Sequence, residues 1–300
     1  MNKFPKTLGR FLPNAVFTHQ VEMFFEKENP DKVVPWPKHP IPSWAYSFRP
    51  RVFLDLGSGL GGQTSATLMR LAQWGCLEKL ERVVLVDRDT ELYTSGAQGL
   101  RRHLESRISN TLLMFNLTDI EVQAHVEELT VARNEDNQIE VDPLAKICPE
   151  ADLILASHVT YYFGDGSGRE LIEGLLQSHI SSGGKLWVNI RDLNCPVYSK
   201  RYDTVKSLGL VDEQPFDYSE YFYSDVIPNL AHMRLIDTAT IGVDVRPGVD
   251  RVSAAYLAMW RTNIDPDDEH LLPMLNAAQS LEMQTGPVFS ETHFIIAHDE

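Results

Sequence analysis

The stretch RVFLDLGSGLGGQT, residues 51–64, has the residue types and spacing of a cofactor-binding turn. An apolar run reaches Asp55 and is followed by Gly57, Gly59, Gly61 and Gly62. Glycine allows positive φ in a turn and lets a ligand touch the backbone. The first N–H groups of the helix that we expect to begin near residue 63 can hold a carboxylate or a phosphate at the same point. The stretch therefore predicts a site for an adenine nucleoside cofactor.

Two classes of cofactor fit these glycines. Gly57, Gly59 and Gly62 also match the G-x-G-x-x-G fingerprint of dinucleotide-binding proteins, and Asp87 ends the next apolar run, where a carboxylate can bind a ribose. Asp55 favours the other class, because a carboxylate beside the turn suits the ammonium of a methionyl group and repels a pyrophosphate. We expect S-adenosylmethionine, and a nicotinamide-dependent oxidoreductase stays the alternative.

Further polar side chains follow the later apolar runs. IEVQAHV ends at Glu127 and Glu128, ADLILASHV is apolar up to Ser157 and His158, and KLWVNIRD ends at Asp192. Ligands of open α/β sheets bind at the carboxyl ends of the strands, so these residues are candidates for the site. His158 is the candidate catalytic residue, because an imidazole can either deprotonate or orient an acceptor.

The elements that must position these residues form a regular series from Arg51 onward. Five short β-branched runs alternate with amphipathic stretches of helix length, which indicates parallel strands joined by crossover helices. Two later runs, MRLIDTATIGVDV and THFIIAHDE, complete the set. The series predicts an α/β fold with one doubly wound, seven-stranded and mostly parallel sheet.

Residues 1–50 differ from the rest, because they contain a helical pattern over residues 15–29 and then a proline-rich stretch. We expect residues 1–50 to form a segment separate from a core at 51–300, with substrate-pocket insertions around 193–230 and 246–288. The region VDEQPFDYSEYFYSDVIPNL, residues 211–230, predicts helices and loops, and its exposed aromatic residues would suit a partner protein if the chain were a non-catalytic scaffold.

The charge of the chain is uneven. The net charge is -15, and residues 201–300 carry 17 Asp and Glu against 6 Lys and Arg. Such a field disfavours nucleic-acid partners and favours a cationic small molecule. No apolar run is long enough to span a membrane, and the first twenty residues lack the apolar stretch and the cleavage site of a signal peptide, so we expect a cytoplasmic protein. The three cysteines are far apart and suggest neither a disulfide frame nor a metal site.

The motifs LDLGSGLGG, VVLVDRD, ADLILASHVTYYF and SSGGKLWVNIRD resemble, in this order, the class I S-adenosylmethionine-dependent methyltransferases over residues 51–192. The flanking stretches RFLPNAVFTHQVEMFF, ASHVTYYF and FSETHFIIAHDE resemble the histamine N-methyltransferase type of small-molecule enzyme. That type implies an N-terminal cap or lid over the cofactor, which residues 1–50 would form here. This chain departs from its pattern at Thr18, His158 and Glu291, which implies a different acceptor.

The resemblance and the motifs together assign residues to three roles. We predict that the cofactor is bound by Asp55, Gly57, Ser58, Gly59, Gly61, Asp87, Arg88, Glu128, Leu129 and Ser157. We predict that the substrate, an amine or an amino-acid-like compound, is bound by Thr18, Glu22, Tyr161, Tyr162, Asp192 and Glu291. The reaction expected is N-methylation, with O- or C-methylation as alternatives, and the sequence does not determine the oligomeric state.

Overall fold

The computed structural model describes residues 41–88, 96–160, 163, 168–191, 199, 203–204, 206–207, 218–230, 233–243, 273, 276 and 289–298. The helix expected at 15–29 and Cys195, one of the three cysteines, lie outside these residues.

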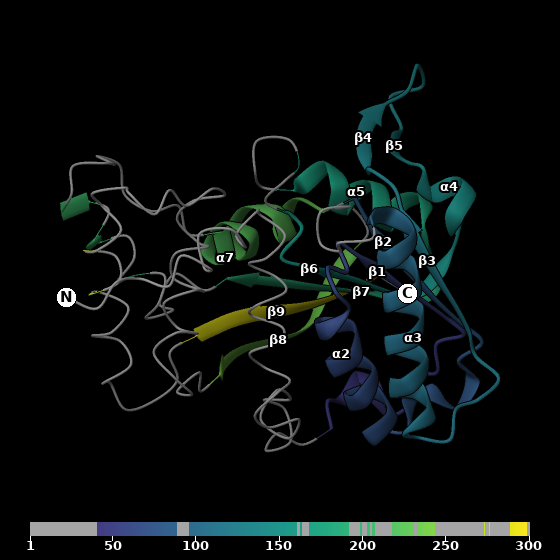
Figure 1. Ribbon diagram of the computed structural model, residues 1–300. Coiled ribbons are helices and arrows are strands. Elements are labelled where there is room, and N and C mark those ends of the chain that lie inside the picture. The colour runs from purple at the N-terminus through teal and green to yellow at the C-terminus, as the bar shows by residue number, and fades with distance from the viewer. Residues whose placement is uncertain are drawn as a thin grey trace.

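Seven strands form one sheet in the order β3-β2-β1-β6-β7-β9-β8. Their bounds are β1 Val52–Leu56, β2 Arg82–Asp87, β3 Glu121–Val126, β6 Ala151–Ser157, β7 Ile180–Arg191, β8 Met233–Val243 and β9 Phe289–His298. The pairs from β3 to β7 are parallel, whereas β9 runs antiparallel to both β7 and β8. Figure 1 shows β9, in yellow, between these two strands. The prediction of a seven-stranded, mostly parallel sheet is confirmed.

Helices cover both faces of the sheet (Figure 1). One face carries α2, Gly62–Gln73, and α3, Gly96–Leu113, and the other carries α4, Leu144–Ile147, and α5, Arg169–Ser178. Short helical turns complete the described part of the chain, at η1 Ser43–Ala45, η2 Cys76–Lys79, α7 Tyr218–Tyr221, η5 Phe222–Val226 and η6 Ile227–Asn229. The last three lie in the region that we expected to hold helices and loops.

The strands are apolar on both faces because helices cover both faces. Leu54 and Leu56 of β1 pack with Leu171 and Leu175 of α5 in one buried cluster. Side chains alternate along a strand, so Asp55 lies on the opposite face, toward α2. Each fully buried leucine contributes roughly 1.5–3 kcal/mol to stability. An aspartate buried near the carboxyl end of such a strand costs stability, which indicates a role other than packing.

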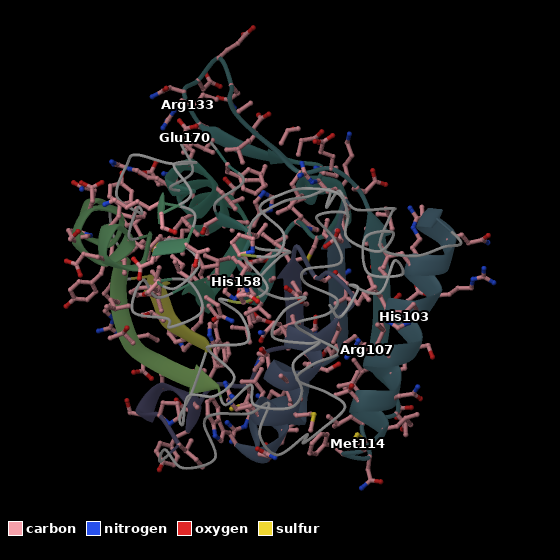
Figure 2. All side chains as sticks on the ribbon, turned by 60° about the vertical axis from the view of Figure 1, so that its left-hand side comes forward. His103, Arg107, Met114, Arg133, His158 and Glu170 are labelled. Carbon is pink, nitrogen blue, oxygen red and sulfur yellow. The ribbon has the colours of Figure 1, made fainter. Side chains whose placement is uncertain are left out.

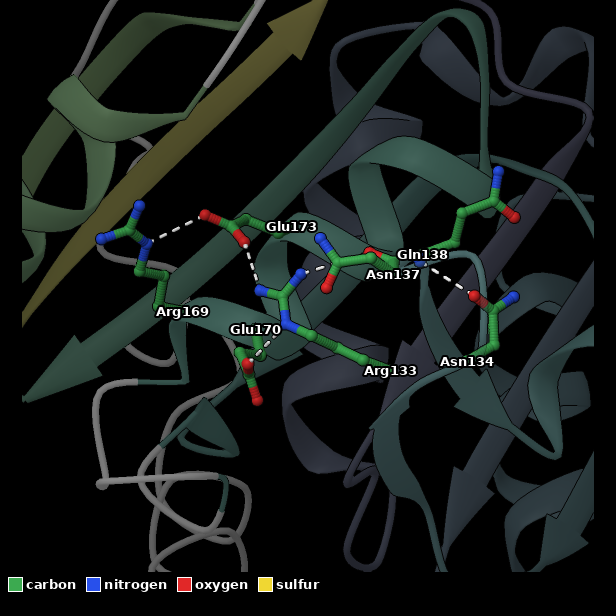
Figure 3. Close-up of polar contacts among 7 residues, drawn as sticks. All are labelled: Arg133, Asn134, Asn137, Gln138, Arg169, Glu170 and Glu173. Carbon is green, nitrogen blue, oxygen red and sulfur yellow. Dashed lines mark hydrogen bonds and ion pairs between the residues drawn. The ribbon is translucent and has the colours of Figure 1, made fainter.

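A β-hairpin was not predicted from the sequence. The strands β4, Thr130–Arg133, and β5, Ile139–Asp142, pair antiparallel and project from the α5 side of the molecule (Figure 1). Arg133 forms ion pairs with Glu170 at 3.1 Å and Glu173 at 3.7 Å, and Arg169 binds Glu173 at 2.9 Å (Figure 3). The run is mostly polar and exposed, so it lacks the apolar signal on which the other strands were recognised.

Trp44 attaches the segment before β1 to the sheet. Its Nε1–H donates to Asp237 Oδ2 at 3.1 Å, and its ring lies edge-on to Trp74 and Trp187 with centroids 5.8 and 6.1 Å away. Arg70 of α2 lies 5.9 Å from the ring centroids of both Trp74 and Trp187. Aromatic and cation–π contacts of this kind contribute about 1 kcal/mol each. They hold the described segment before β1, which begins at residue 41, against the sheet.

Candidate functional site

The glycine turn joins the carboxyl end of β1 to α2. Gly57, Gly59 and Gly61 have φ of +67°, +55° and +83°, which L side chains rarely adopt. Gly57 is also crowded, because a Cβ built there would lie 3.0 Å from Val159 Cγ2. The N–H groups of Gly57 and Ser58 both donate to the carbonyl of Val86, at 2.8 and 3.2 Å. The turn is therefore held against the end of β2.

Asp87 ends β2 and reaches the same turn. The N–H of Gly59 donates to Asp87 Oδ2 over 2.7 Å, and both groups are buried. The parallel register places Leu56 beside Val86, so the two strand ends lie next to each other. The structure thus joins two predicted cofactor residues, 28 positions apart in the chain, by a direct hydrogen bond.

Asp55 lies beneath the turn. Its side chain is buried, Oδ2 accepts a hydrogen bond from the Thr64 hydroxyl, and Oδ1 has no hydrogen-bond partner. Burial raises the pKa of the Asp55 carboxyl to about 8, the Thr64 hydrogen bond opposes this rise, and the charge of Asp87 adds to it. A buried carboxylate oxygen without a donor is costly, so this oxygen is suited to a cation or another donor. Ser58 Oγ is likewise buried without a hydrogen-bond partner.

Helix α3 supports the outer side of the turn. Arg107 Nη1 donates to the carbonyl of Leu60 at 2.9 Å, and His103 also hydrogen-bonds to Leu60. Figure 2 shows His103 and Arg107 close together along α3. A Cβ added at Gly61 would lie 3.1 Å from Leu104 Cδ2. Burial lowers the pKa of His103, so the neutral ring is favoured beside the turn.

A second group of predicted residues lies at the carboxyl end of β6. His158 follows Ser157 with φ of +55°, and its N–H donates to the carbonyl of Asn189 on β7 at 3.0 Å. Asn189 Nδ2 donates to Ser157 Oγ at 3.2 Å, while Asn189 Oδ1 is buried without a partner. His158 is half-buried and is labelled in Figure 2. The strain of the His158 backbone conformation costs on the order of 1 kcal/mol, which its hydrogen bond to the Asn189 carbonyl offsets.

Arg88 and Glu128, both predicted to bind cofactor, are exposed and form an ion pair at 3.6 Å. Glu127 pairs with Arg101 at 3.9 Å, and Leu129 packs against the apolar cluster on the α5 face. Thr18, Glu22, Tyr161, Tyr162 and Asp192 lie outside the described residues. For Glu291 the structure gives only the backbone, which pairs with Arg191 of β7 and Ile241 of β8.

Thr64 and Asn189 belong to the site but were not predicted. Thr64 lies two residues after Gly62, at the start of α2, and its hydroxyl contacts Asp55. A hydroxyl so soon after the last glycine is the signal in the sequence that could have identified it. Asn189 gave a weaker signal, as the one amide in the apolar stretch LWVNI. Its importance depends on the β6–β7 register, which pairs it with Ser157.

The described part of the chain contains no group of three His, Cys, Asp or Glu side chains that could hold a metal ion. Within the same residues, no helix combines the length and apolar character that crossing a membrane requires. Cys76 and Cys148 are buried free thiols.

The strand order identifies the class of fold. A dinucleotide-binding sheet of the usual type has six strands in the order 3-2-1-4-5-6. Here the last strand in sequence, β9, is inserted antiparallel between β7 and β8. This sheet, with a glycine turn after β1 and an acidic residue ending β2, is the Rossmann-like fold of the class I methyltransferases.

No family model matches the chain, and no curated protein matches its sequence. Solved structures similar to it include YjhP from E. coli, with 14% identity and a TM-score of 0.42 over 89% of this chain and 98% of that chain. An S-adenosylmethionine-dependent methyltransferase from Geobacter sulfurreducens in complex with S-adenosylhomocysteine has 15% identity and a TM-score of 0.44, with 89% and 96% covered. A methyltransferase from Thiobacillus denitrificans in the same complex has 12% identity and a TM-score of 0.43, with 99% of each chain covered. Likenesses this distant assign no activity, so the assignment of the fold rests on the strand order and the glycine turn described above.

Proposed function

We propose that this protein is an S-adenosylmethionine-dependent methyltransferase that acts on a small molecule. The observation that carries the proposal is the contact between Asp87 Oδ2 and the Gly59 N–H, with the buried carboxyl of Asp55 beneath the same turn. This arrangement puts two acidic side chains and a left-handed glycine turn at the carboxyl edge of the sheet.

The residues present fit the cofactor. Asp55 Oδ1 is a buried acceptor without a donor, which suits the ammonium of the methionyl group. Asp87 stands at the end of β2, where a carboxylate can accept hydrogen bonds from ribose hydroxyls. In this proposal Gly57, Gly59, Gly61 and Ser58 surround the methionyl part, and Arg88, Glu128, Leu129 and Ser157 lie toward the adenosine.

The same geometry argues against a dinucleotide. Pyrophosphates bind to free N–H groups at the turn and the helix N-terminus. Here the Gly59 N–H already donates to a carboxylate, and the N–H groups of Gly57 and Ser58 donate to Val86. The Asp87 carboxylate at the turn would also repel the negative charges of a pyrophosphate. The same carboxylate favours a cofactor with a positive sulfur and an ammonium.

The protein would act mainly by holding and orienting the reactants. S-adenosylmethionine supplies an electrophilic methyl group when it is bound. Proximity and alignment account for a large share of the rate of such transfers. His158 follows the end of β6, where its N–H donates to the carbonyl of Asn189 on β7. We propose that the His158 side chain orients the acceptor or takes its proton.

We propose that the acceptor is an amine or an amino-acid-like compound. The excess of acidic residues over basic residues in 201–300 favours a cationic ligand. Tyr161, Tyr162, Thr18, Glu22, Asp192 and Glu291 are the proposed substrate residues, and residues 1–50 are the proposed cap.

Calorimetric titration with S-adenosylmethionine, S-adenosylhomocysteine and NADH tests the cofactor proposal. Wild type should bind both adenosyl compounds and not NADH. Asp87→Ala should weaken the binding of both adenosyl compounds at least tenfold, because one good hydrogen bond to a charged acceptor is worth about 1.5–3 kcal/mol. Asp119→Ala is the matched control, since Asp119 is exposed and lies on the loop before β3. Binding of NADH alone, or an unchanged affinity in Asp87→Ala, would contradict the proposal.

A further inference from the structure

Among the residues that the structure describes, none places a positive charge beside Asp55 that could balance it. Within the described residues, the Thr64 hydroxyl is the hydrogen-bond donor to Oδ2, and Oδ1 has none. The register partner of Asp55 on β6 is Leu155, which is uncharged. The nearby titratable group on β2 is Asp87, which is also an acid. An ionised Asp55 would therefore be a buried charge without a counter-ion, which is one of the most costly arrangements in a protein.

The basic side chains around the turn are used elsewhere. Arg107 and His103 of α3 bind the carbonyl of Leu60 on the outer side. Arg70, further along α2 than Thr64, lies against the rings of Trp74 and Trp187. Burial is the largest cause that raises the pKa of Asp55 to about 8, so the neutral acid predominates at pH 7 when no cation is bound.

From this geometry, and on the basis of the function proposed above, we infer that Asp55 is a proton-linked receptor for the α-ammonium of the cofactor. The carboxyl is protonated in the free protein and ionised in the complex. The O–H bond of the carboxylic acid breaks, its proton passes to solvent, and the carboxylate accepts a hydrogen bond from the incoming ammonium. Each molecule that carries this ammonium therefore releases about one proton as it binds at pH 7.

Proton release distinguishes two ligands that share the adenosyl part. S-adenosylhomocysteine carries the α-ammonium, whereas 5′-methylthioadenosine lacks the amino-acid part. Titrating both into the full-length protein at pH 7, in phosphate and in Tris, gives the number of protons released from the difference in binding heat. We expect about one proton for S-adenosylhomocysteine and close to none for 5′-methylthioadenosine. Groups that contact the ribose, Asp87 included, contribute equally to both ligands and cancel.

The affinity should follow the same linkage. Between pH 6 and pH 8 the affinity for S-adenosylhomocysteine should rise roughly 50-fold, and that for 5′-methylthioadenosine should change little. Asp55→Asn cannot ionise, so its affinity for S-adenosylhomocysteine should not vary over this range. Its binding of 5′-methylthioadenosine reports whether the variant is folded.

Two further variants keep the test informative if Asp55→Asn does not fold. Thr64→Val removes the hydroxyl that favours the ionised carboxylate, so the rise in affinity should move to higher pH, while Thr64→Ser should keep the wild-type profile. Equal proton release for the two ligands, or a flat pH profile for both, would overturn the inference and leave the methyltransferase proposal standing. Failure of both ligands to bind would overturn the two together.

Discussion

Gly57 and Gly75 have nearly the same left-handed φ, +67° and +70°, but their surroundings differ. A Cβ at Gly57 would meet Val159, whereas a Cβ at Gly75 would meet nothing within 4 Å. Both substitutions to Ala carry the backbone cost of about 1–2 kcal/mol. The difference between the two variants therefore isolates the contact at the turn.

We expect Gly57→Ala to abolish or strongly weaken binding of S-adenosylhomocysteine, and Gly75→Ala to leave its affinity within about twofold. Both variants should lose about 1–2 kcal/mol of stability, and Gly57→Ala more because Val159 must move. Calorimetry and urea unfolding measure the two effects. Equal affinity in the two variants would show that the shape of the glycine turn does not matter for binding.

Asp55 also predicts how stability depends on pH. Its pKa is raised in the folded protein from 3.8 to about 8, so the folded state holds this proton more tightly than the unfolded state does. The resulting stabilisation is complete below pH 4 and is lost as pH rises through 8. Between pH 5 and pH 7 wild type should lose up to about 1.4 kcal/mol per pH unit relative to Asp55→Asn.

Urea unfolding of wild type, Asp55→Asn and the surface control Asp119→Asn at each pH from 5 to 9 measures this difference. The free energy of unfolding of wild type should fall with pH relative to that of Asp55→Asn, and this difference should stop changing above pH 8. The free energy of unfolding of Asp119→Asn should stay parallel to that of wild type. A gap that stays constant would mean that Asp55 is ionised throughout, and the proton-linked receptor would then have no basis.

Among the elements, the β4–β5 hairpin depends on a glycine in the helix beneath it. Gly174 lies in α5, and a Cβ there would come within 2.8 Å of Ile139 Cγ2 and 2.9 Å of Val141 Cγ2. Glycine inside a helix normally costs 0.5–1 kcal/mol relative to Ala. Here the close approach of the hairpin outweighs that preference, because both contacts are shorter than real Cβ atoms allow.

We therefore expect Gly174→Ala to destabilise the protein by about 1–3 kcal/mol in spite of its better helix propensity. Adding Ile139→Ala should cost less in the Gly174→Ala background than in wild type, since it removes the methyl group that clashes. A double-mutant cycle by urea unfolding measures this coupling. If Gly174→Ala stabilises the protein, the hairpin is not packed on α5 as described.

Exposed ion pairs contribute less to the hairpin than this contact. Arg133 and Glu170 have side chains 42% and 49% exposed, so their pair is worth at most about 1 kcal/mol. The apolar residues Ile139 and Val141 are buried and hold the hairpin more firmly. The ion pairs seen in Figure 3 thus orient the hairpin rather than anchor it.

At the scale of the whole molecule, the strands of the main sheet and their ends were predictable because each strand is an apolar run that a two-sided sheet requires. Their order in the sheet was not predicted. The residues at those ends, Asp55, Asp87 and Ser157, could be identified in the same way. Asn189 could not, because its contact with Ser157 depends on strand register. The hairpin was missed because its strands have only four residues each, β4 is mostly exposed, β5 alternates between buried and exposed, and polar residues dominate the run.

The position of β9 has a consequence for how the chain is made. A ribosome releases β7 and β8 long before β9, yet in the sheet these two strands are joined only through β9 among the described residues. Until β9 emerges, one edge of β7 and, among the described residues, both edges of β8 present unpaired backbone groups, which are templates for pairing with other chains. The growing polypeptide thus carries these open edges until β9 has been made, and a chain that stops before residue 289 would keep them.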